Sequence, residues 1–319
     1  MSAKQLARLA LIFGALLLLW GGAAMARHHD KSPDGSDAFR LPKVTRTTVD
    51  TLILAHATDT TVLAKKDTSH WTVNGHPAAT QAVADLFTAL ADTAAGSDLI
   101  AEQKTSHASL GVDSAGGTRV VIKGGGKTVA DLVAGHRSAD FSGGYVRRAD
   151  QVATYELRGR LVEWLTRPGD EWRDHRIAGV ASDSVAGIEV SRGVKRYTLK
   201  SSGTKWELSP GGLADSTAAA NLVAAYRTVD ASGFATKPEA DSARFSPPDR
   251  RTRLFRKDGT ALLTLLFDST KAGFWVKPDT GTTIYKLDSW AGDRLAPADS
   301  TLRPHPAKSA TGASTKKES

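Results

Sequence analysis

An internal repeat restricts the fold of this chain more than any other feature of its sequence. In both halves a hydrophobic strand is followed by a second strand, a polar turn and a third strand that carries a tryptophan. The first copy reads VDTLIL at 49–54 and VLAKKDTSHWTV at 62–73, and the second reads VAGIEV at 185–190 and YTLKSSGTKWEL at 197–208. A sequence that recurs at a fixed period encodes one structural unit more than once. We therefore expect two copies of the same fold.

The spacing between matching residues is nearly constant along the two copies. It is 135 positions between Trp71 and Trp206, and it falls slowly to 129 between Tyr145 and Phe274. Loop deletions produce such a drift. The alignment therefore continues well beyond the first three strands.

Each tryptophan is followed by the pattern of an amphipathic helix, with apolar residues at i, i+3, i+4 and i+7. The apolar stripe of the first copy consists of Val83, Leu86, Phe87 and Leu90. The comparable stripe of the second copy consists of Leu222, Val223, Tyr226 and Val229. The expected N-caps are Thr80 in the first copy and Ser216 or Thr217 in the second.

A strand pair follows each helix, at 118–135 and at 252–267. The turn of the first pair, GGGKT at 124–128, resembles half of a phosphate-binding loop. The complete motif has a glycine where this chain has Val121, and it leads from a strand into a helix. The matching turn of the second copy is KDGT at 257–260, which is typical of a hairpin. We therefore interpret both segments as hairpin turns.

These patterns predict an α+β fold, in which an N-terminal transmembrane helix precedes two tandem copies of an antiparallel-sheet-plus-helix unit. The segment LLTLLF at 262–267 is apolar on both alternations, so it should be a strand covered on both faces. The expected segments are an anchor or signal peptide at 1–30, a linker at 31–44, the first copy at 45–165, a link at 166–182, the second copy at 183–295 and a disordered tail at 296–319.

The N-terminal helix is predicted from an uncharged apolar run at 9–26, which follows Lys4 and Arg8. A helix rises about 1.5 Å per residue, so this run approaches the hydrocarbon core of about 30 Å. Basic residues before the run favour a cytoplasmic N-terminus. The pattern predicts a single-pass protein of the cell inner membrane, with its body in the periplasm or at the cell exterior.

A cleaved signal peptide is the alternative interpretation of the same run. Ala24-Met25-Ala26 matches the small-residue pattern of a cleavage site. In both interpretations residues 32–319 lie outside the cytoplasm. Only a retained run would keep the chain in contact with the membrane through residues 9–26.

The formal net charge of +8 comes mainly from the two ends of the chain. Residues 1–31 and 303–319 contribute +3 each, and the body between them carries +2. A nearly neutral body does not attract nucleic acid electrostatically, so no nucleic-acid partner is expected. Cysteine is absent, which excludes disulfides, thiolate metal sites and cysteine nucleophiles.

No sequence pattern indicates catalysis or metal binding. The nine histidines are dispersed, and the GxSxG motif of serine hydrolases does not occur. The densest cluster of charges, GDEWRDHR at 169–176, is interpreted as a solvated link with local ion pairs. We therefore expect no catalytic residues, no cofactor and no metal, and the chain is not expected to be an enzyme.

Aromatic residues supply the candidates for a partner surface. Trp71 and Trp206 hold equivalent places in the two copies, so we expect both in the cores. The predicted partner surface consists of Tyr145, Phe274 and Trp275. Phe274 and Trp275 are adjacent on a strand and point to opposite faces, so one of them should face outward.

The order of these motifs resembles the bacterial domain-of-unknown-function 4340 family over roughly residues 45–295. The second copy departs from the pattern, because Pro247-Pro248 replaces Gly111-Val112. The motifs that carry the resemblance are the strand and turn from Lys65 to Trp71, the Leu-Gly-x-Asp turn at 110–113, the Tyr-x-charged segment from Tyr145 to Arg148 and the Trp-Arg-Asp-x-Arg link at 172–176.

The resemblance implies a membrane-anchored extracytoplasmic protein, often encoded beside ABC-transport components of the gliding-motility type, and it supplies no catalytic residues. The favoured function is a membrane-tethered extracytoplasmic binding or scaffold module, accessory to an ABC-type transport complex with ABC-transporter components as partners. One alternative is a cell-envelope glycan- or polymer-binding protein, which a concave aromatic pocket would favour. The other is an enzyme without a recognisable motif, which converging ionisable groups would favour.

Overall fold

The computed structural model describes residues 39–92 and 96–304. The chain divides between Trp172 and Arg173 into two compact units, called unit 1 and unit 2. No helix within the described ranges is long and apolar enough to cross a membrane. The predicted anchor at 9–26 lies outside these ranges, as do residues 305–319 of the predicted tail.

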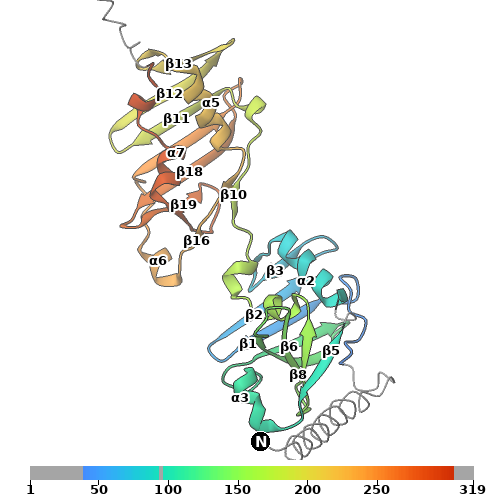
Figure 1. Cartoon of the computed structure of the whole chain (residues 1–319). Helices are drawn as coiled ribbons and strands as arrows, with labels where there is room; N and C mark the ends of the chain where they lie inside the picture. Colours follow the sequence, from blue (N-terminus) through green and yellow to red (C-terminus); the bar gives the residue numbers. More distant parts are fainter. Residues whose placement is uncertain (1–38, 93–95, 305–319) are drawn as a thin grey trace, which may run out of the picture. The chain divides into compact units, whose positions relative to one another are not determined.

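Unit 1 is built on a nine-stranded antiparallel sheet with the order β4-β3-β2-β1-β6-β7-β8-β9-β5 (Figure 1). Its strands are β1 (Thr51–His56), β2 (Asp59–Lys65), β3 (Trp71–Val73), β4 (His76–Pro77), β5 (Ser97–Ala101), β6 (Thr118–Gly124), β7 (Lys127–Arg137), β8 (Gly143–Arg148) and β9 (Thr154–Arg158). Its helices are α2 (Thr80–Asp92), η2 (Lys104–Ser106), α3 (His107–Leu110), α4 (Leu161–Leu165) and η3 (Gly169–Trp172).

Unit 2 contains a second nine-stranded antiparallel sheet with the order β14-β13-β12-β11-β17-β18-β19-β20-β16, and a separate pair of β10 and β15. Its strands are β10 (Arg176–Ala178), β11 (Gly187–Arg192), β12 (Lys195–Ser202), β13 (Lys205–Ser209), β14 (Gly212–Leu213), β15 (Val229–Asp230), β16 (Gly233–Phe234), β17 (Arg250–Phe255), β18 (Ala261–Ser269), β19 (Gly273–Pro278) and β20 (Tyr285–Asp288). Its helices are η4 (Ser182–Ser184), α5 (Ser216–Ala225), α6 (Lys237–Ser242), α7 (Ser289–Leu295) and η5 (Asp299–Leu302).

The two large sheets have the same strand order. In each, the first strand lies in the interior of the sheet: β1 lies between β2 and β6, and β11 lies between β12 and β17. The last strand of each meander pairs with a short edge strand, β5 or β16, that comes earlier in the chain. Antiparallel sheets with a few helices confirm the predicted α+β class. An identical strand order is what a duplicated unit requires.

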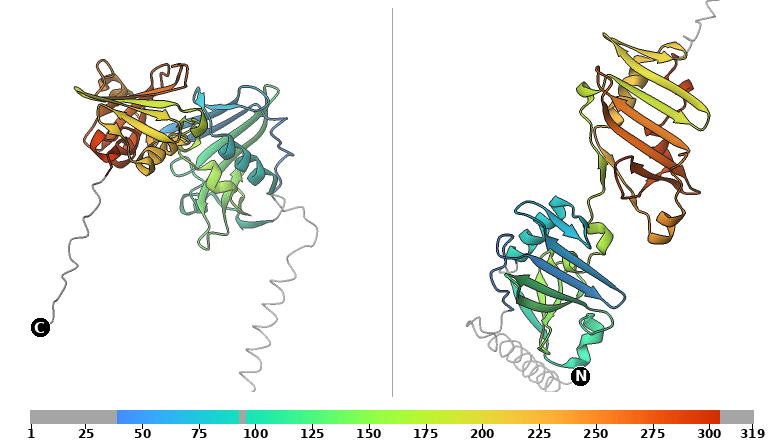
Figure 2. Two further views of the ribbon diagram at one scale, coloured as in Figure 1. Left: turned by 90° about the horizontal axis from the view of Figure 1, so that it is seen from above. Right: turned by 180° about the vertical axis from the view of Figure 1, so that it is seen from behind.

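The core of each unit lies between the sheet and the helices on one of its faces. In unit 2, α5 and α7 lie over one face of the sheet (Figure 1), and the view from behind shows the strands in front (Figure 2). In unit 1 the buried side of α2 carries Val83, Leu86, Phe87 and Leu90, as its apolar stripe predicts. Within residues 39–92 and 96–304, no such helix layer covers the opposite face of either sheet.

Both glycine-rich segments are hairpin turns, as predicted. Gly125 and Gly126 connect β6 to β7 with φ of 57° and 76°, and Gly259 connects β17 to β18 with φ of 84°. Glycine adopts these left-handed angles without steric cost, which is why it occupies such turns. No helix follows Gly126, so the phosphate-loop interpretation does not hold.

The predictions for the second helix need correction. Asp215, not Ser216 or Thr217, caps α5, because its carboxylate accepts a hydrogen bond from the Ala218 amide at 2.8 Å. The helix ends at Ala225, so the predicted stripe extends too far. Its last two members are Tyr226, whose buried hydroxyl donates to the Leu295 carbonyl, and Val229, which begins β15.

Two predictions of burial hold only in part. Trp71 is buried beside Phe87, with their ring centroids 5.4 Å apart. Trp206 holds the matching register position but is only partly buried. In each unit the tryptophan lies two residues from a buried pair between the second and third strands, Leu63–Val73 in unit 1 and Leu199–Leu208 in unit 2. The LLTLLF strand is buried on the helix side, whereas Leu262 and Leu266 on the open face stay partly exposed. Thr264, between them, is buried, so the expectation that both faces are covered holds only in part.

Both units extend beyond the boundaries expected from the sequence. Phe39 and Val44 are buried in unit 1, so residues 39–44 belong to the unit and not to a linker. Trp172 is also part of its core, although it lies within the predicted link. In unit 2 the core includes Leu302, which falls in the predicted tail. These buried residues stand alone in polar surroundings, so local hydrophobicity gave no sign of them.

The strand register corrects the alignment of the copies by one residue. Tyr145 pairs with Glu156 as Trp275 pairs with Lys286, so Tyr145 matches Trp275 and not Phe274. The position equivalent to Phe274 is therefore Gly144. This offset of 130 continues to the ends of both units, where Trp172 and Leu302 each close a 3₁₀ turn and are both buried.

A reciprocal exchange of large and small residues supports this register. A side chain on Gly144 would meet Val162 of α4 at 2.7 Å. In unit 2 the partners are reversed, because a side chain on Gly292 of α7 would collide with the ring of Phe274. The same space between sheet and helix is thus filled in both units. In unit 1 Val162 of α4 fills it, and in unit 2 Phe274 of β19 fills it.

Candidate binding surface

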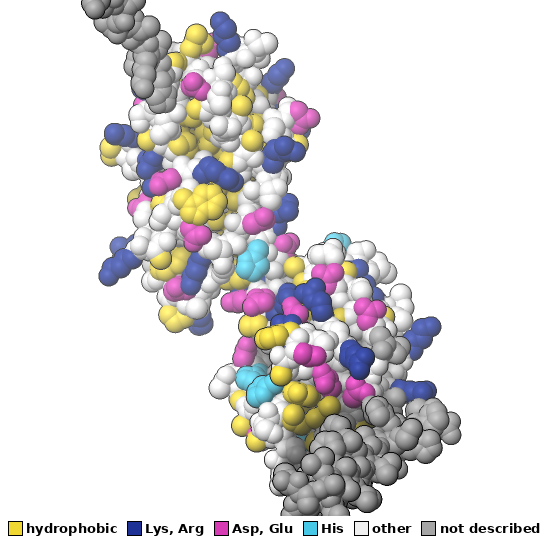
Figure 3. All heavy atoms as spheres, viewed as in Figure 1, with side chains coloured by type: hydrophobic (Ala, Val, Ile, Leu, Met, Phe, Trp, Pro, Cys, Tyr) yellow, Lys and Arg dark blue, Asp and Glu magenta, His cyan; other side chains and the backbone are white. Residues whose placement is uncertain are grey.

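Two hollows lie next to each other along the helices of unit 2. The first, of about 660 Å³, is lined by residues that include Ala218, Asn221, Ala224, Pro297 and Thr301. The second, of about 320 Å³, is lined by residues that include Thr228, Asp230, Ser232, Asp288 and Trp290. Ala225 and Arg294 line both hollows, which are therefore neighbours and are together called the α5–α7 groove. On this side of unit 2 hydrophobic side chains gather between charges of both signs (Figure 3).

The groove lies where unit 1 is filled by aromatic side chains. Trp164 of α4 is only 4% exposed and packs against Trp172, with ring centroids 5.6 Å apart. The register places Arg294 and Leu302 at the equivalent positions of unit 2. Neither side chain fills the space beside the long helix as an indole ring does. Arginine directs its charged end to water, and leucine is smaller than tryptophan.

Trp290 and Arg294 form a stacked pair at this groove. The guanidinium carbon of Arg294 lies 5.5 Å from the centroid of the Trp290 ring, within cation–π distance. Unit 1 has the same pair with its members exchanged, because Arg160 lies 5.6 Å from the ring of Trp164. The exchange moves the indole from a buried to an exposed position, and Trp290 is 64% exposed.

Among the described residues, the charges of the groove leave one cation, Arg294, and one anion, Asp288, without an ion-pair partner. Asp293 forms an ion pair with Arg250 at 2.6 Å, and Asp230 forms one with Arg176 at 2.9 Å. Arg294 forms no ion pair with any residue of 39–92 or 96–304. Its guanidinium therefore presents N–H donors to whatever enters the groove.

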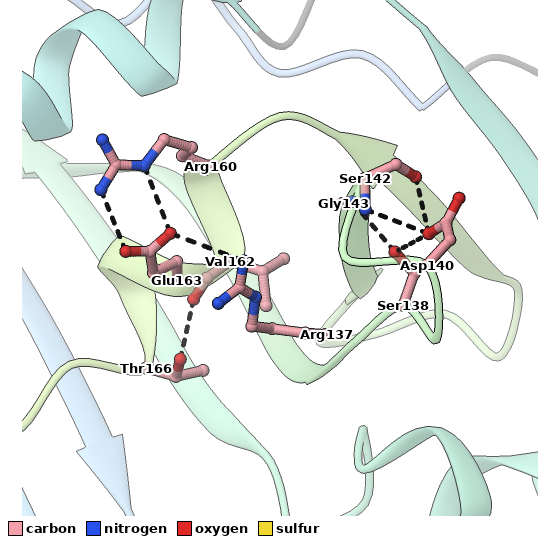
Figure 4. Close-up of polar contacts among 9 residues, drawn as sticks. All are labelled: Arg137, Ser138, Asp140, Ser142, Gly143, Arg160, Val162, Glu163 and Thr166. Atoms are coloured by element: carbon pink, nitrogen blue, oxygen red, sulfur yellow. Dashed lines mark hydrogen bonds and ion pairs between the residues drawn. The ribbon is translucent and has the colours of Figure 1, made fainter.

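A second exposed aromatic residue, Phe141, lies in the loop between β7 and β8 of unit 1. It is 70% exposed, its φ is 59°, and the guanidinium of Arg137 lies 5.3 Å from its ring. A positive φ is unusual for a bulky side chain. The Asp140 carboxylate holds the loop by accepting bonds from the Ser142 amide and from the hydroxyls of Ser142 and Ser138 (Figure 4). The same bonds, led by that from the Ser142 amide, lower the pKa of Asp140.

We predict that Phe141→Asn will be more stable than Phe141→Ala by about 1 kcal/mol, because asparagine tolerates the left-handed region and alanine does not. Both variants remove the exposed ring, so the comparison isolates the backbone conformation. The difference in unfolding free energy is measured by denaturant unfolding of the full chain, with hydrogen exchange of unit 1 peptides as the signal. Equal stability of the two variants would contradict the left-handed conformation.

The structure places only two of the three predicted partner-surface residues at the surface. Tyr145 and Trp275 lie at matching positions on the open faces of their sheets and are partly exposed. The prediction that Phe274 belongs to the partner surface is wrong, because Phe274 is only 6% exposed and packs in the core beside Phe267. The structure does not bring Tyr145 or Trp275 into the α5–α7 groove.

Sequence reasoning did not single out Trp290 or Arg294. The signal was present in the segment SWAGDRL at 289–295, where an aromatic and a basic residue are four positions apart on a short helix. The first copy has the reverse order, Arg160 before Trp164. Only the register of the two copies shows that these pairs correspond.

Comparison with known protein families gives one match. The family described as a domain of unknown function, DUF4340, matches residues 71–248, which is more than half of the chain. The chain belongs to the DUF4340 family. Its matched segment runs from β3 of unit 1 to the end of the loop before β17 of unit 2. No curated protein and no solved structure matches the chain.

The Leu-Gly-x-Asp motif of this DUF4340 chain has a structural role. Gly111 ends α3 in the left-handed conformation, and the Asp113 carboxylate accepts a bond from the Gly116 amide at 2.8 Å. Arg147 of β8 donates to the Val112 carbonyl at 2.8 Å and to three carbonyls at the end of β8 and in the loop after it. Its burial lowers the pKa of Arg147. The turn and the Tyr-x-charged segment thus hold each other in place.

The Trp-Arg-Asp-x-Arg motif of the DUF4340 pattern is shared between the units. Trp172 belongs to the core of unit 1, whereas Arg173 lies 3.5 Å from the ring centroid of Phe234 in unit 2. His175 contacts the same ring, and Arg176 pairs with Asp230. Trp172, Arg173 and His175 are therefore packed, which corrects the expectation of a fully solvated link, whereas Asp170, Glu171, Asp174 and Arg176 are exposed as expected. No cluster of three or more metal-binding side chains occurs in the described ranges.

Proposed function

We propose that this DUF4340 protein is a membrane-tethered extracytoplasmic binding module, and that unit 2 holds an extended partner along the α5–α7 groove. The observation that carries the proposal is the exposure of Trp290 beside Arg294, which stands where unit 1 has the buried Trp164. Tryptophan and arginine are the residue types most enriched where binding energy concentrates. An exposed tryptophan of this kind has no role in the core.

The chemistry of the groove favours binding over catalysis. Neither hollow is lined by a histidine or a lysine, Asp230 and Asp293 are both paired with arginines, and Asp288 is exposed to water. Acid–base or nucleophilic catalysis needs a group with a proton to exchange beside a reacting atom. A single arginine beside a tryptophan supplies recognition instead.

The tether is proposed from the apolar run at 9–26, and a transport complex as partner from the family resemblance. A module held at the membrane meets membrane-bound partners at a high effective concentration, so a single modest groove is sufficient for stable association. This accessory role to an ABC-type transport complex requires no chemistry from the chain itself.

The proposal is tested by purifying full-length protein from native membranes in mild detergent, as parent and as Trp290→Ala and Arg294→Ala variants. We expect each substitution to reduce the co-purified partner at least about tenfold, the effect of a residue central to binding. Val194→Ala, at an almost fully exposed position in the β11–β12 turn, and Arg251→Ala, exposed on β17, should change nothing. Co-purification that is the same in all variants would show that the groove is not the binding surface.

A further inference from the structure

We infer that unit 1 pairs with a second copy of this chain through its edge strand β5, so that the two sheets join edge to edge. The inference rests on the membrane tether of the proposed function and is independent of the α5–α7 groove. Four properties of β5 support it: its length, its open backbone groups, its exposed apolar side chains and its place next to Phe39.

β5 is the longest of the four strands at the edges of the two large sheets. The other three, β4, β14 and β16, have two residues each, whereas β5 has five and forms the outer strand of unit 1 (Figure 1). Proteins protect their sheet edges with short strands, proline or lysine, because an open edge is a template for pairing with another chain. β4 is short and contains Pro77, whereas β5 contains neither proline nor lysine.

The backbone of β5 presents open donors and acceptors at this edge. The Arg158 amide donates to the Gly96 carbonyl, so in the register of β5 with β9 Ser97 and Leu99 lie at the alternate, non-hydrogen-bonded positions. Their N–H and C=O groups therefore point away from β9, and no other strand of the described residues pairs with them. A row of such groups is recognised by another extended backbone.

The side chains at this edge are apolar and exposed. Leu99 is 40% exposed and Ile100 is 43% exposed. Phe234 matches Leu99 in the register of unit 2, but it is buried, with the guanidinium of Arg173 3.5 Å from its ring centroid. Contact with a second chain would remove Leu99 and Ile100 from water, which unit 2 achieves at the matching position within its own chain.

The position of the edge favours a second copy over a foreign strand. The Phe39 amide donates to the Ser97 hydroxyl at 2.8 Å, so β5 lies beside the point from which the chain continues towards its N-terminus. Twelve residues separate Phe39 from the apolar run at 9–26, and they can span at most about 40 Å. In the tethered protein the β5 edges of all copies therefore lie close to the same membrane, where tethering raises their effective concentration.

The charges of β5 select one antiparallel register for this pairing. Asp98 is its only charged residue and already pairs with Arg158 of β9 at 3.0 Å. A register with Ser97 opposite Leu99 of the second copy would place Asp98 opposite Asp98, which is destabilising, and a register centred on Ser97 would leave Leu99 uncovered. We therefore expect Leu99 to face its own counterpart.

The test is disulfide formation in native membranes, which is unambiguous because the chain contains no cysteine. Full-length Leu99→Cys protein is oxidised mildly beside the controls Phe141→Cys and Val194→Cys, whose positions are more exposed. Opposed residues of such a pair have Cα atoms about 5.5 Å apart, within the range of a disulfide. We expect Leu99→Cys to form at least about tenfold more disulfide-linked dimer than either control. Adding Ile100→Lys to Leu99→Cys should lower the dimer at least about tenfold, because lysine opposes pairing at an edge.

Equal dimerisation of the three single-cysteine variants would show random collision, and the inference would fail. It fails too if Leu99→Cys stays monomeric: a thiol that reacts with maleimide in membranes would show an open edge, and a protected thiol would show that a different protein covers it. Fractionation of the same cells tests the tether. If the chain is soluble and Leu99→Cys still dimerises, the tether of the proposed function fails and the edge contact stands, while co-purification with Trp290→Ala reports on the groove alone.

Discussion

Gly144→Phe is expected to destabilise unit 1 by about 3 kcal/mol, because it forces a ring into a filled space between the sheet and α4. The first atom of the new side chain would already lie 2.7 Å from two carbons of Val162, and 3.0 Å from the His136 carbonyl oxygen. The same phenylalanine is accommodated at the equivalent position of unit 2, where the helix has Gly292. The loss should appear as faster hydrogen exchange in β7, β8 and α4, with unit 2 unchanged.

The second substitution, Val162→Gly, should recover part of this loss when combined with Gly144→Phe. The pair then carries the combination that unit 2 has, and we expect a favourable coupling of about 1–3 kcal/mol in a double-mutant cycle. The recovery is partial because the His136 carbonyl belongs to the backbone and because glycine weakens a helix. Tyr145→Phe, on the open face of the same strand, is the control and should change stability little. Simple addition of the two single losses would contradict the reciprocal packing.

Trp172→Ala is expected to lower the free energy of unfolding of unit 1 by about 3–5 kcal/mol, as for other buried tryptophans. Its side chain is fully buried against Trp164, and its carbonyl accepts a hydrogen bond from the Ala79 amide at 2.8 Å at the start of α2. The loss should be confined to unit 1, although the motif continues into Arg173. Hydrogen exchange resolved by peptide distinguishes the two units in one experiment.

Trp172→Leu is the matched variant, since leucine is the residue that unit 2 has at this position. Leu302 is equally buried, and its carbonyl accepts the Asp215 amide at 2.8 Å in the same way. We expect leucine to retain a substantial part of the lost stability, because the backbone bond is kept and a large apolar side chain remains. If either variant made the backbone amides of unit 2 exchange faster, Trp172 would be shown to stabilise both units.

The sequence was most informative where structure depends on neighbours in the chain. The turns at Gly125–Gly126 and Gly259 follow from the conformational freedom of glycine, and the buried side of α2 follows from helical spacing. The α+β class follows from the same local signals. Each of these needs only a few consecutive residues to specify it.

The rest depends on contacts between distant residues. A shift of one position in the alignment exchanges the two faces of a strand, so Phe274 was assigned to the surface when the register places it in the core. Trp172 and Leu302 lie in polar segments that gave no local signal, yet they close cores whose elements are distant in the chain. Their carbonyls accept hydrogen bonds from Ala79 and Asp215, which are 93 and 87 positions earlier. The same holds for the groove, whose lining comes from α5, α7 and the end of unit 2.

The reciprocal packing of glycine against a large residue also bears on how the chain folds during synthesis. Two units with the same strand order expose the chain to exchange of equivalent strands, the characteristic misassembly of tandem repeats. A β19 strand inserted into unit 1 would press Phe274 against Val162, and a β8 strand inserted into unit 2 would leave a hole between Gly144 and Gly292. Both hybrids are therefore disfavoured relative to the correct pairings, so the divergence of the two copies protects a duplicated chain from pairing with itself in the wrong order.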